Sequence, residues 1–183
     1  MKTRQINLFL TFFLGIILLA SARGWAVSNF ASPGPIITHS FGPEVGKYGD
    51  PLKFYIEADD PAADMQKIAI VVDQTGYGHY PTDWVYIPQG DRHHFVGYLQ
   101  WNTFSNNASK MPEWTQLTVK ISIVDTKGNE SNAVVFPLEF VSNAVPTVKP
   151  PAPFDSPNLQ RLGHIDINLY NPNEIGGEPR SRW

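Results

Sequence analysis

The stretch Thr115–Asp125, TQLTVKISIVD, decides the fold class of this chain of 183 residues. Every second residue in its centre is apolar, and the residues between them are polar. The apolar positions are Leu117, Val119, Ile121 and Ile123. Alternation with a period of two, rich in β-branched residues, is typical of a strand that buries one face. The stretch therefore predicts a β-strand that packs one side against a hydrophobic core.

Six further segments around this strand carry the same signal, and turn residues separate them. The expected strands are Pro35–Phe41, Pro51–Ala58, Gln66–Asp73, Asp83–Ile87, Arg92–Trp101 and Ser131–Val141. Seven short strands with no helical run between them predict an all-β domain over residues 35–141. Two packed antiparallel sheets forming a β-sandwich are expected, and a small closed barrel is the alternative. Pro137 cannot donate to a ladder, so the last strand should lie at a sheet edge there.

Two segments of this region resemble a known family. Residues 125–131, DTKGNES, have the pattern of the turn that joins the last two strands of bacterial immunoglobulin-like and fibronectin type III-like modules. Residues 49–64, GDPLKFYIEADDPAAD, are similar to the second strand and following loop of such modules. In the first segment Gly128 and Asn129 tolerate a positive φ, and Asp125 can accept hydrogen bonds from backbone amides. The resemblance implies an immunoglobulin-like sandwich but no single function, because this fold carries many unrelated binding roles.

The first 26 residues have the composition of a secretory signal peptide, which would be helical. Lys2 and Arg4 precede an apolar run, Leu8–Ala20, and small residues follow. The run is shorter than a typical membrane-spanning helix. We therefore expect cleavage after Ala22 or Ala26 and a mature protein that is secreted or periplasmic. Contact with a membrane is expected only through the transient leader.

Composition narrows the partners of the mature part. The leader holds three of the 14 basic residues of the chain and none of the 17 acidic ones. The mature part is therefore clearly acidic, and neither a nucleic-acid partner nor attraction to anionic lipid is expected. The chain has no cysteine, which excludes disulfides, thiolate metal sites and a lipidated cysteine anchor.

No catalytic motif stands out, so we expect no enzyme. The sequence lacks a G-x-S-x-G element, a glycine-rich phosphate loop and an H-E-x-x-H zinc motif. Asp59, Asp60 and Asp64 form an acidic loop, and carboxylates on one loop are ligands that calcium prefers. A solvated turn with aspartate-to-backbone hydrogen bonds is the alternative. The adjacent His93 and His94 would point to opposite faces of a strand and could not share a metal. No cofactor is therefore expected, and calcium is the candidate ion for the acidic loop.

Aromatic residues are frequent between positions 77 and 114, and some of them are candidates for a binding surface. Tyr77 and Tyr80 fall in an expected loop, and Trp84 falls near the start of a strand. Tyrosine and tryptophan side chains give a large contact area at low entropic cost. These three residues are therefore candidate contacts for a protein or, alternatively, for a glycan. Packing over the end of the sandwich is the remaining interpretation.

The C-terminal part divides into a proline-rich linker, residues 142–160, and an extended or disordered tail, residues 161–183. Within the tail, Ile165, Ile167 and Leu169 alternate with polar residues, which is typical of a strand. An isolated strand is not stable in water. The three apolar residues are therefore candidates for adding to the sheet of a partner. Docking on the chain's own sandwich and disorder are the alternatives.

Together these features predict an exported, non-enzymatic module in which residues 27–34 form a short arm before the sandwich. Such a module would mediate protein–protein contacts in the cell envelope or outside the cell. The alternative is a carbohydrate-binding module that stacks its loop aromatics on sugar rings.

Overall fold

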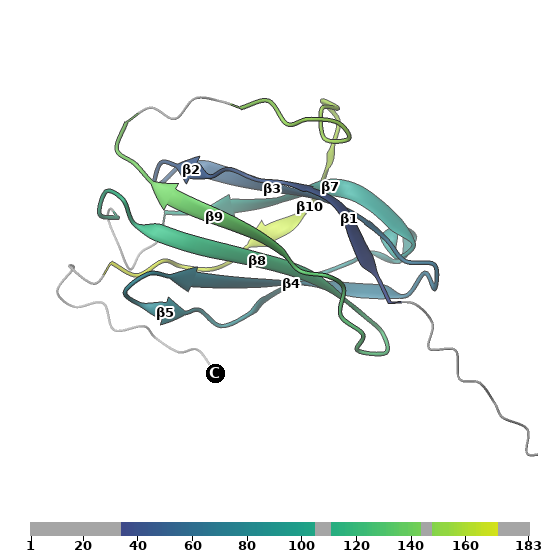
Figure 1. The fold of residues 1–183 in the computed structure, drawn as a ribbon. Helices are drawn as coiled ribbons and strands as arrows, with labels where there is room; N and C mark the ends of the chain where they lie inside the picture. Colours follow the sequence, from purple (N-terminus) through teal and green to yellow (C-terminus); the bar gives the residue numbers. More distant parts are fainter. Residues whose placement is uncertain (1–33, 105–110, 144–147, 172–183) are drawn as a thin grey trace, which may run out of the picture. The chain divides into compact units, whose positions relative to one another are not determined.

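The computed structural model describes residues 34–104, 111–143 and 148–171 (Figure 1). Every described residue belongs to one compact unit, Ser32–Trp183. The expected signal peptide and residues 172–183 of the tail lie outside the described residues. Within the described ranges, no helix is long and apolar enough to cross a membrane.

Strands make up almost all of the regular structure. The strands are β1 (Ile36–Phe41), β2 (Val45–Gly46), β3 (Pro51–Asp59), β4 (Met65–Gln74), β5 (Gly78–His79), β6 (Asp83–Tyr86), β7 (His94–Asn102), β8 (Gln116–Asp125), β9 (Val134–Phe140) and β10 (Gln160–Ile165). One 3-10 turn, η1 (Gln89–Asp91), is the helical element of the described part. All seven expected strands are present within a few residues of their expected bounds. The additional strands are β2, β5 and β10.

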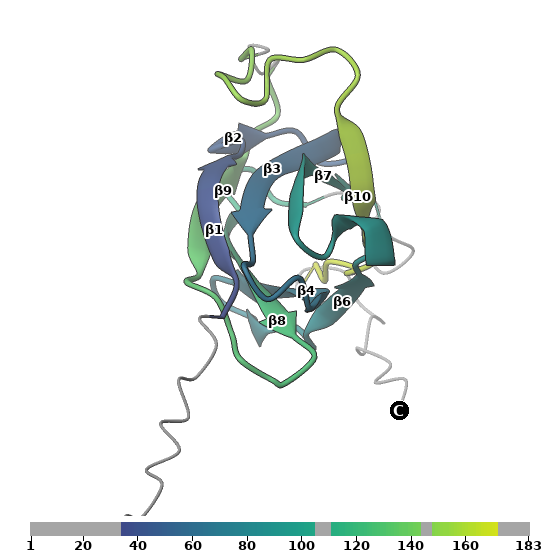
Figure 2. The ribbon, with the colours of Figure 1, turned by 90° about the vertical axis from the view of Figure 1, so that its right-hand side faces the viewer.

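Two sheets face each other across the core and confirm the immunoglobulin-like sandwich (Figures 1 and 2). The four-stranded sheet has the order β1-β3-β7-β10. The six-stranded sheet has the order β2-β9-β8-β4-β5, and β6 also pairs with β4. The expectation of purely antiparallel sheets is wrong in two places, because β2 pairs parallel with β9 and β10 pairs parallel with β7. Both sheets are therefore mixed.

The core forms from the inward faces that the alternation predicts. Fully buried side chains come from both sheets and include Phe54, Ile56, Ile68, Ile70, Leu99, Trp101, Ile121 and Ile123. Burial of each such side chain stabilises the fold by about 1.5–3 kcal/mol. Pro137 lies at an open edge of β9, as expected, because β2 pairs only with Glu139 and Phe140.

The turn between β8 and β9 is built as its sequence predicts. Gly128 has a φ of 86°, which glycine adopts without steric cost. The buried carboxylate of Asp125 accepts hydrogen bonds from the backbone amides of Lys127 and Asn129, both at 2.8 Å. It also accepts one from the Asn129 side chain at 2.7 Å. These bonds hold the two strand ends in the hairpin.

The C-terminal segment completes the sandwich. After β9 the chain crosses to the four-stranded sheet, where β10 lies beside β7 (Figure 2). In immunoglobulin domains one sheet has the strand order A-B-E-D, so the fourth strand of the chain, D, lies beside strand E. In the order β1-β3-β7-β10, β10 has the place that strand D has there. Here the last strand occupies it. Phe154, in the proline-rich segment, is also buried, and its ring centroid lies 5.6 Å from that of Tyr55 on β3.

Candidate functional site

The three apolar tail residues lie inside the chain's own core, so their assignment to a partner's sheet is wrong. Ile165, Ile167 and Leu169 are 4%, 6% and 0% exposed. The indole N–H of Trp101, on β7, donates to the carbonyl of Ile167 at 2.9 Å. The side-chain amide of Gln74 donates to the carbonyl of Tyr170 at 2.9 Å. Buried side chains thus hold the backbone of this segment, and no free strand remains here for a partner.

The loop tyrosines support this docking and are not free for a ligand. Tyr80 is buried, its hydroxyl donates to the side-chain oxygen of Gln74, and the same hydroxyl accepts from the backbone N–H of Tyr170 at 2.8 Å. Burial raises the pKa of Tyr80 to about 12. Tyr77 is half-buried, with its ring centroid 4.9 Å from that of Tyr80 and 5.0 Å from that of Tyr170. Both tyrosines therefore pack against the C-terminal segment. This arrangement agrees with the interpretation that the loop aromatics pack over the end of the sandwich.

Trp84 remains as an exposed aromatic residue, and the structure adds Tyr86 to it. Both lie on β6 and are separated by one residue, so they project from the same side of the strand. Their exposed fractions are 42% for Trp84 and 72% for Tyr86. The residue between them, Val85, points to the other side and packs against the core. The aromatic pair thus lies on the outer face of the six-stranded sheet.

The tryptophan ring is held in place by a neighbour on β4. The ammonium group of Lys67 lies 3.9 Å from the ring centroid of Trp84. Such a cation–π contact is worth about 0.5–1 kcal/mol at an exposed site. In the ladder, Lys67 is opposite Tyr86 and Ala69 is opposite Trp84. This contact therefore favours one orientation of the indole above the β4 strand.

The same outer face continues over the central strands and mixes apolar with polar side chains. Moving away from Trp84, the ladder places Ser122 beyond Ala69. A second row runs from Val71 through Lys120 to Val135, which is 57% exposed. We call the outward side chains of β6, β4, β8 and β9 the outer face. Its exposed aromatic edge, Trp84 and Tyr86, makes it a candidate contact surface, although Ala69 and Ser122 within it are buried.

The acidic loop does not gather its carboxylates around a common point. Asp60 is buried, and its carboxylate accepts from the backbone amides of Ala62 and Asp64, both at 3.0 Å. Asp59 pairs with His94 at 2.9 Å, and Asp64 pairs with the ammonium of Lys127 at 2.8 Å. This ammonium hydrogen bond lowers the pKa of Asp64.

Asp60 therefore makes the aspartate-to-backbone bonds of a turn, whereas Asp59 and Asp64 pair with side chains. Among residues 34–104, 111–143 and 148–171, no group of three or more acidic or histidine side chains could hold a metal ion.

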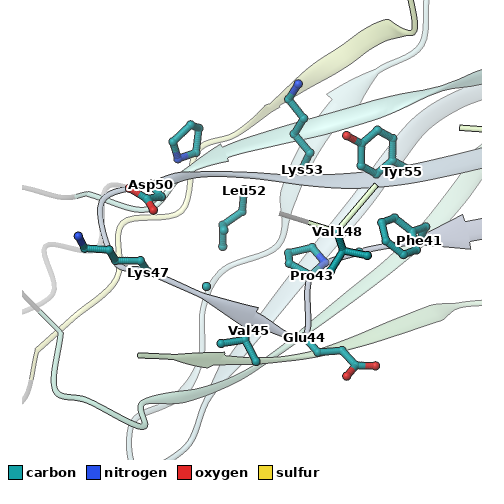
Figure 3. A pocket seen from close by; sticks show the side chains of 13 residues that line it. Phe41, Pro43, Glu44, Val45, Lys47, Asp50, Leu52, Lys53, Tyr55 and Val148 are labelled. Carbon is teal, nitrogen blue, oxygen red and sulfur yellow. The ribbon is translucent and has the colours of Figure 1, made fainter. Parts of the chain in front are cut away.

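A groove of about 600 Å³ lies between the β1–β2 connection, β3 and the proline-rich segment (Figure 3). Phe41, Pro43 and Val148 gather at one end of it, and Lys47 and Asp50 lie at the other. Two cations and two carboxylates line an otherwise apolar surface. This lining has no arrangement of a nucleophile with a base, and the groove therefore gives no basis for a catalytic site.

Two more exposed aromatic residues lie away from the outer face. Phe104 is 58% exposed and Trp114 is 68% exposed. Trp114 has a φ of 62°, which is unusual for a large residue, and its backbone N–H donates to the carbonyl of Phe140 at 2.7 Å. Both residues lie within the β7–β8 connection, and Trp114 offers a control tryptophan for Trp84.

Comparison of the sequence and the fold with known proteins does not indicate a function for this chain. No protein-family model and no curated protein matches the sequence. The PKD domain of an M14-like peptidase from a Thermoplasmatales archaeon is 16% identical, with a TM-score of 0.38, over 61% of this chain and 100% of that chain. The CARDB domain of a Pyrococcus furiosus protein, in complex with di-metal ions, is 12% identical, with a TM-score of 0.34, over 61% of this chain and 91% of that chain.

A third similar structure is an alkylpurine DNA glycosylase from Pseudomonas fluorescens bound to DNA containing an abasic site analog. It is 14% identical, with a TM-score of 0.33, over 57% of this chain and 30% of that chain. TM-scores this low carry no inference about a ligand or an activity.

Proposed function

We propose that the protein is an exported, non-enzymatic binding module that contacts another protein through its outer face. The observation that carries this proposal is the exposed pair Trp84 and Tyr86 on the outward side of β6. Aromatic residues of this kind dominate the binding energy of protein interfaces. A large apolar surface left in water is also a recurrent mark of an interaction site.

The composition of the outer face favours a protein over other partners. Protein interfaces combine aromatic anchors with polar groups rather than forming a uniformly apolar patch. Here Trp84 and Tyr86 lie on the same outward side of the sheet as Lys67 and the exposed Lys120. Lys67 also holds the indole before binding, so less side-chain entropy is lost when a partner covers it. A preorganised anchor of this type suits a specific contact.

Export rests on the leader-like composition of residues 1–26, with its short apolar run and small residues near position 22. An assembly or accessory role in the cell envelope or outside the cell follows from combining export with a contact face. The alternative role is glycan binding, because the Tyr86 ring is largely open and aromatic rings stack on sugars.

Capture from the native envelope or medium tests the proposal. Tagged mature protein, residues 27–183, would be crosslinked and recovered as the wild type, as the double variant Trp84→Ala/Tyr86→Ala, and as Trp114→Ala. The last variant removes a tryptophan outside β6 that is more exposed than Trp84, 68% against 42%. We expect one partner that the wild type and Trp114→Ala retain and the double variant loses. The same proteins recovered with all three would refute the outer face as the contact.

A glycan titration separates the alternative role. Intrinsic tryptophan fluorescence would be followed while soluble polysaccharides are added to the wild type and to Trp84→Ala. A saturable change that Trp84→Ala abolishes, together with no protein partner, would replace the proposal by glycan binding.

A further inference from the structure

The aromatic strand β6 has a ladder partner, β4, along one of its two edges. Its four residues pair with β4 through positions 67–70. On its other side lies the C-terminal segment, residues 160–171, in which β10 belongs to the opposite sheet. Figure 2 shows β10 beside β6 at the edge where the two sheets approach each other. The segment therefore closes the sandwich at the strand that carries the candidate contact.

One carboxylate joins β6 to this segment. One oxygen of Asp83, the first residue of β6, accepts from the backbone N–H of Trp84 at 2.9 Å. The other oxygen accepts from the backbone N–H of Asp166 at 2.7 Å. Hydrogen bonds to a charged acceptor are stronger than neutral ones. Asp83 thus ties the backbone of the aromatic anchor to the backbone that follows β10.

A glycine permits the close approach of the two strands. A Cβ atom on Gly163 would lie 2.5 Å from one methyl carbon of Val85 and 3.0 Å from the other. Val85 is the residue between Trp84 and Tyr86, and it packs inward against the core. Any side chain at position 163 would therefore push β10 away from the centre of β6.

We propose that the docked C-terminal segment positions Trp84 and Tyr86, so that partner binding at the outer face is coupled to docking of residues 160–171. Asp83 and Gly163 are the positioning residues of this coupling. The inference rests on the proposed function. Coupling of this kind is reciprocal, so a partner bound at the outer face also stabilises the docked segment.

Hydrogen exchange of the backbone amides tests the coupling without any partner. Asp83→Asn keeps the shape of the side chain, but its amide has only one oxygen and so can accept only one of the two bonds. We expect exchange of the β6 amides to accelerate at least about tenfold, the order expected for loss of one hydrogen bond to a charged group, while β8 exchange is unchanged.

The matched control is Asp91→Asn. Asp91 accepts one hydrogen bond from the side chain of Gln160 at 2.9 Å, and the single oxygen of asparagine can keep it, so this variant removes a carboxylate charge next to the same segment without removing a hydrogen bond. It should leave β6 exchange at the wild-type rate. Equal acceleration in both aspartate variants, or none in Asp83→Asn, would overturn the coupling. Gly163→Val should accelerate exchange in β6 and β10 together, and an unchanged rate in both strands would also overturn it.

Capture of the partner then separates the two proposals. If Trp84→Ala/Tyr86→Ala abolishes capture, Asp83→Asn should weaken it by about tenfold, by the same lost bond. Unchanged capture and unchanged exchange in Asp83→Asn would overturn the coupling and leave the proposed function intact. If the aromatic double variant has no effect on capture, the proposed function fails, and the exchange measurement still decides whether the segment positions β6.

Discussion

Leu169→Ala should strongly destabilise the protein, although residue 169 lies beyond the last strand. Its side chain is 0% exposed and belongs to the core cluster. Replacement of a buried leucine by alanine costs about 2–5 kcal/mol, because the transfer free energy is lost and a cavity remains. We expect a loss of about 3 kcal/mol in the free energy of unfolding. For a mature domain of this size, this corresponds to a melting temperature lowered by on the order of 10 °C.

Urea unfolding followed by far-ultraviolet circular dichroism measures this loss. Asn168→Ala is the matched control, since Asn168 is the adjacent residue and its side chain is exposed. The control should change the free energy of unfolding by no more than about 0.5 kcal/mol. If Leu169→Ala were as mild as the control, the C-terminal segment would not be docked in solution, and its place in the core would be refuted.

Three other perturbations test the electrostatic and turn contacts. The pKa of Tyr80 rises from 10.0 in the unfolded chain to about 12 in the folded protein, so between these values the unfolded chain binds fewer protons and the free energy of unfolding falls as the pH rises. Tyr80→Phe should make this fall shallower in urea unfolding. An unchanged fall would contradict the assignment to Tyr80. Asp125→Ala removes the acceptor of three turn hydrogen bonds and should cost about 3 kcal/mol in the same assay, whereas a loss below about 1 kcal/mol would show that the turn needs no carboxylate. Because the pKa of Asp64 is lowered in the folded protein, its pairing with Lys127 stabilises the fold above the unfolded pKa of 3.8, and this stabilisation is lost as the pH falls through the folded pKa. The difference in melting temperature between the wild type and Asp64→Asn should therefore vanish in acid. A difference that persists in acid would argue against the ion pair.

The seven central strands could be predicted because each carries its own local pattern. Alternation in β3 and β8 marks the inward side chains, and the structure buries those positions. The two-residue strands β2 and β5 were missed because two residues cannot show a period. The parallel pairing of β10 was missed for a different reason. The alternation of Ile165, Ile167 and Leu169 predicts a strand in the tail, but no local signal says which edge, more than fifty positions earlier in the chain, residues 160–165 will join.

The candidate site was only partly predictable. Trp84 was recognised as an aromatic near a strand start, and Tyr86 could have been added because it lies two positions further along the same strand. Tyr80 lies in a loop, as expected, but the sequence could not decide between a binding role and packing. Its burial depends on Gln74 and on the backbone of Tyr170, and a contact spanning 90 positions leaves no trace in the local sequence.

The late position of β10 in the chain has a consequence for biosynthesis. Chains are made from the N-terminus, and domains of this kind complete their long-range contacts only after the required residues have been synthesised. A chain that has reached residue 159 has every strand of both sheets except β10, yet the indole of Trp101 still lacks the carbonyl of Ile167, which stands 66 positions later. Its core is open along one edge until residues 160–171 arrive. A product that stops before residue 160 should therefore expose core side chains such as Trp101 along this edge, and exposed apolar surface of this kind makes a chain prone to aggregation.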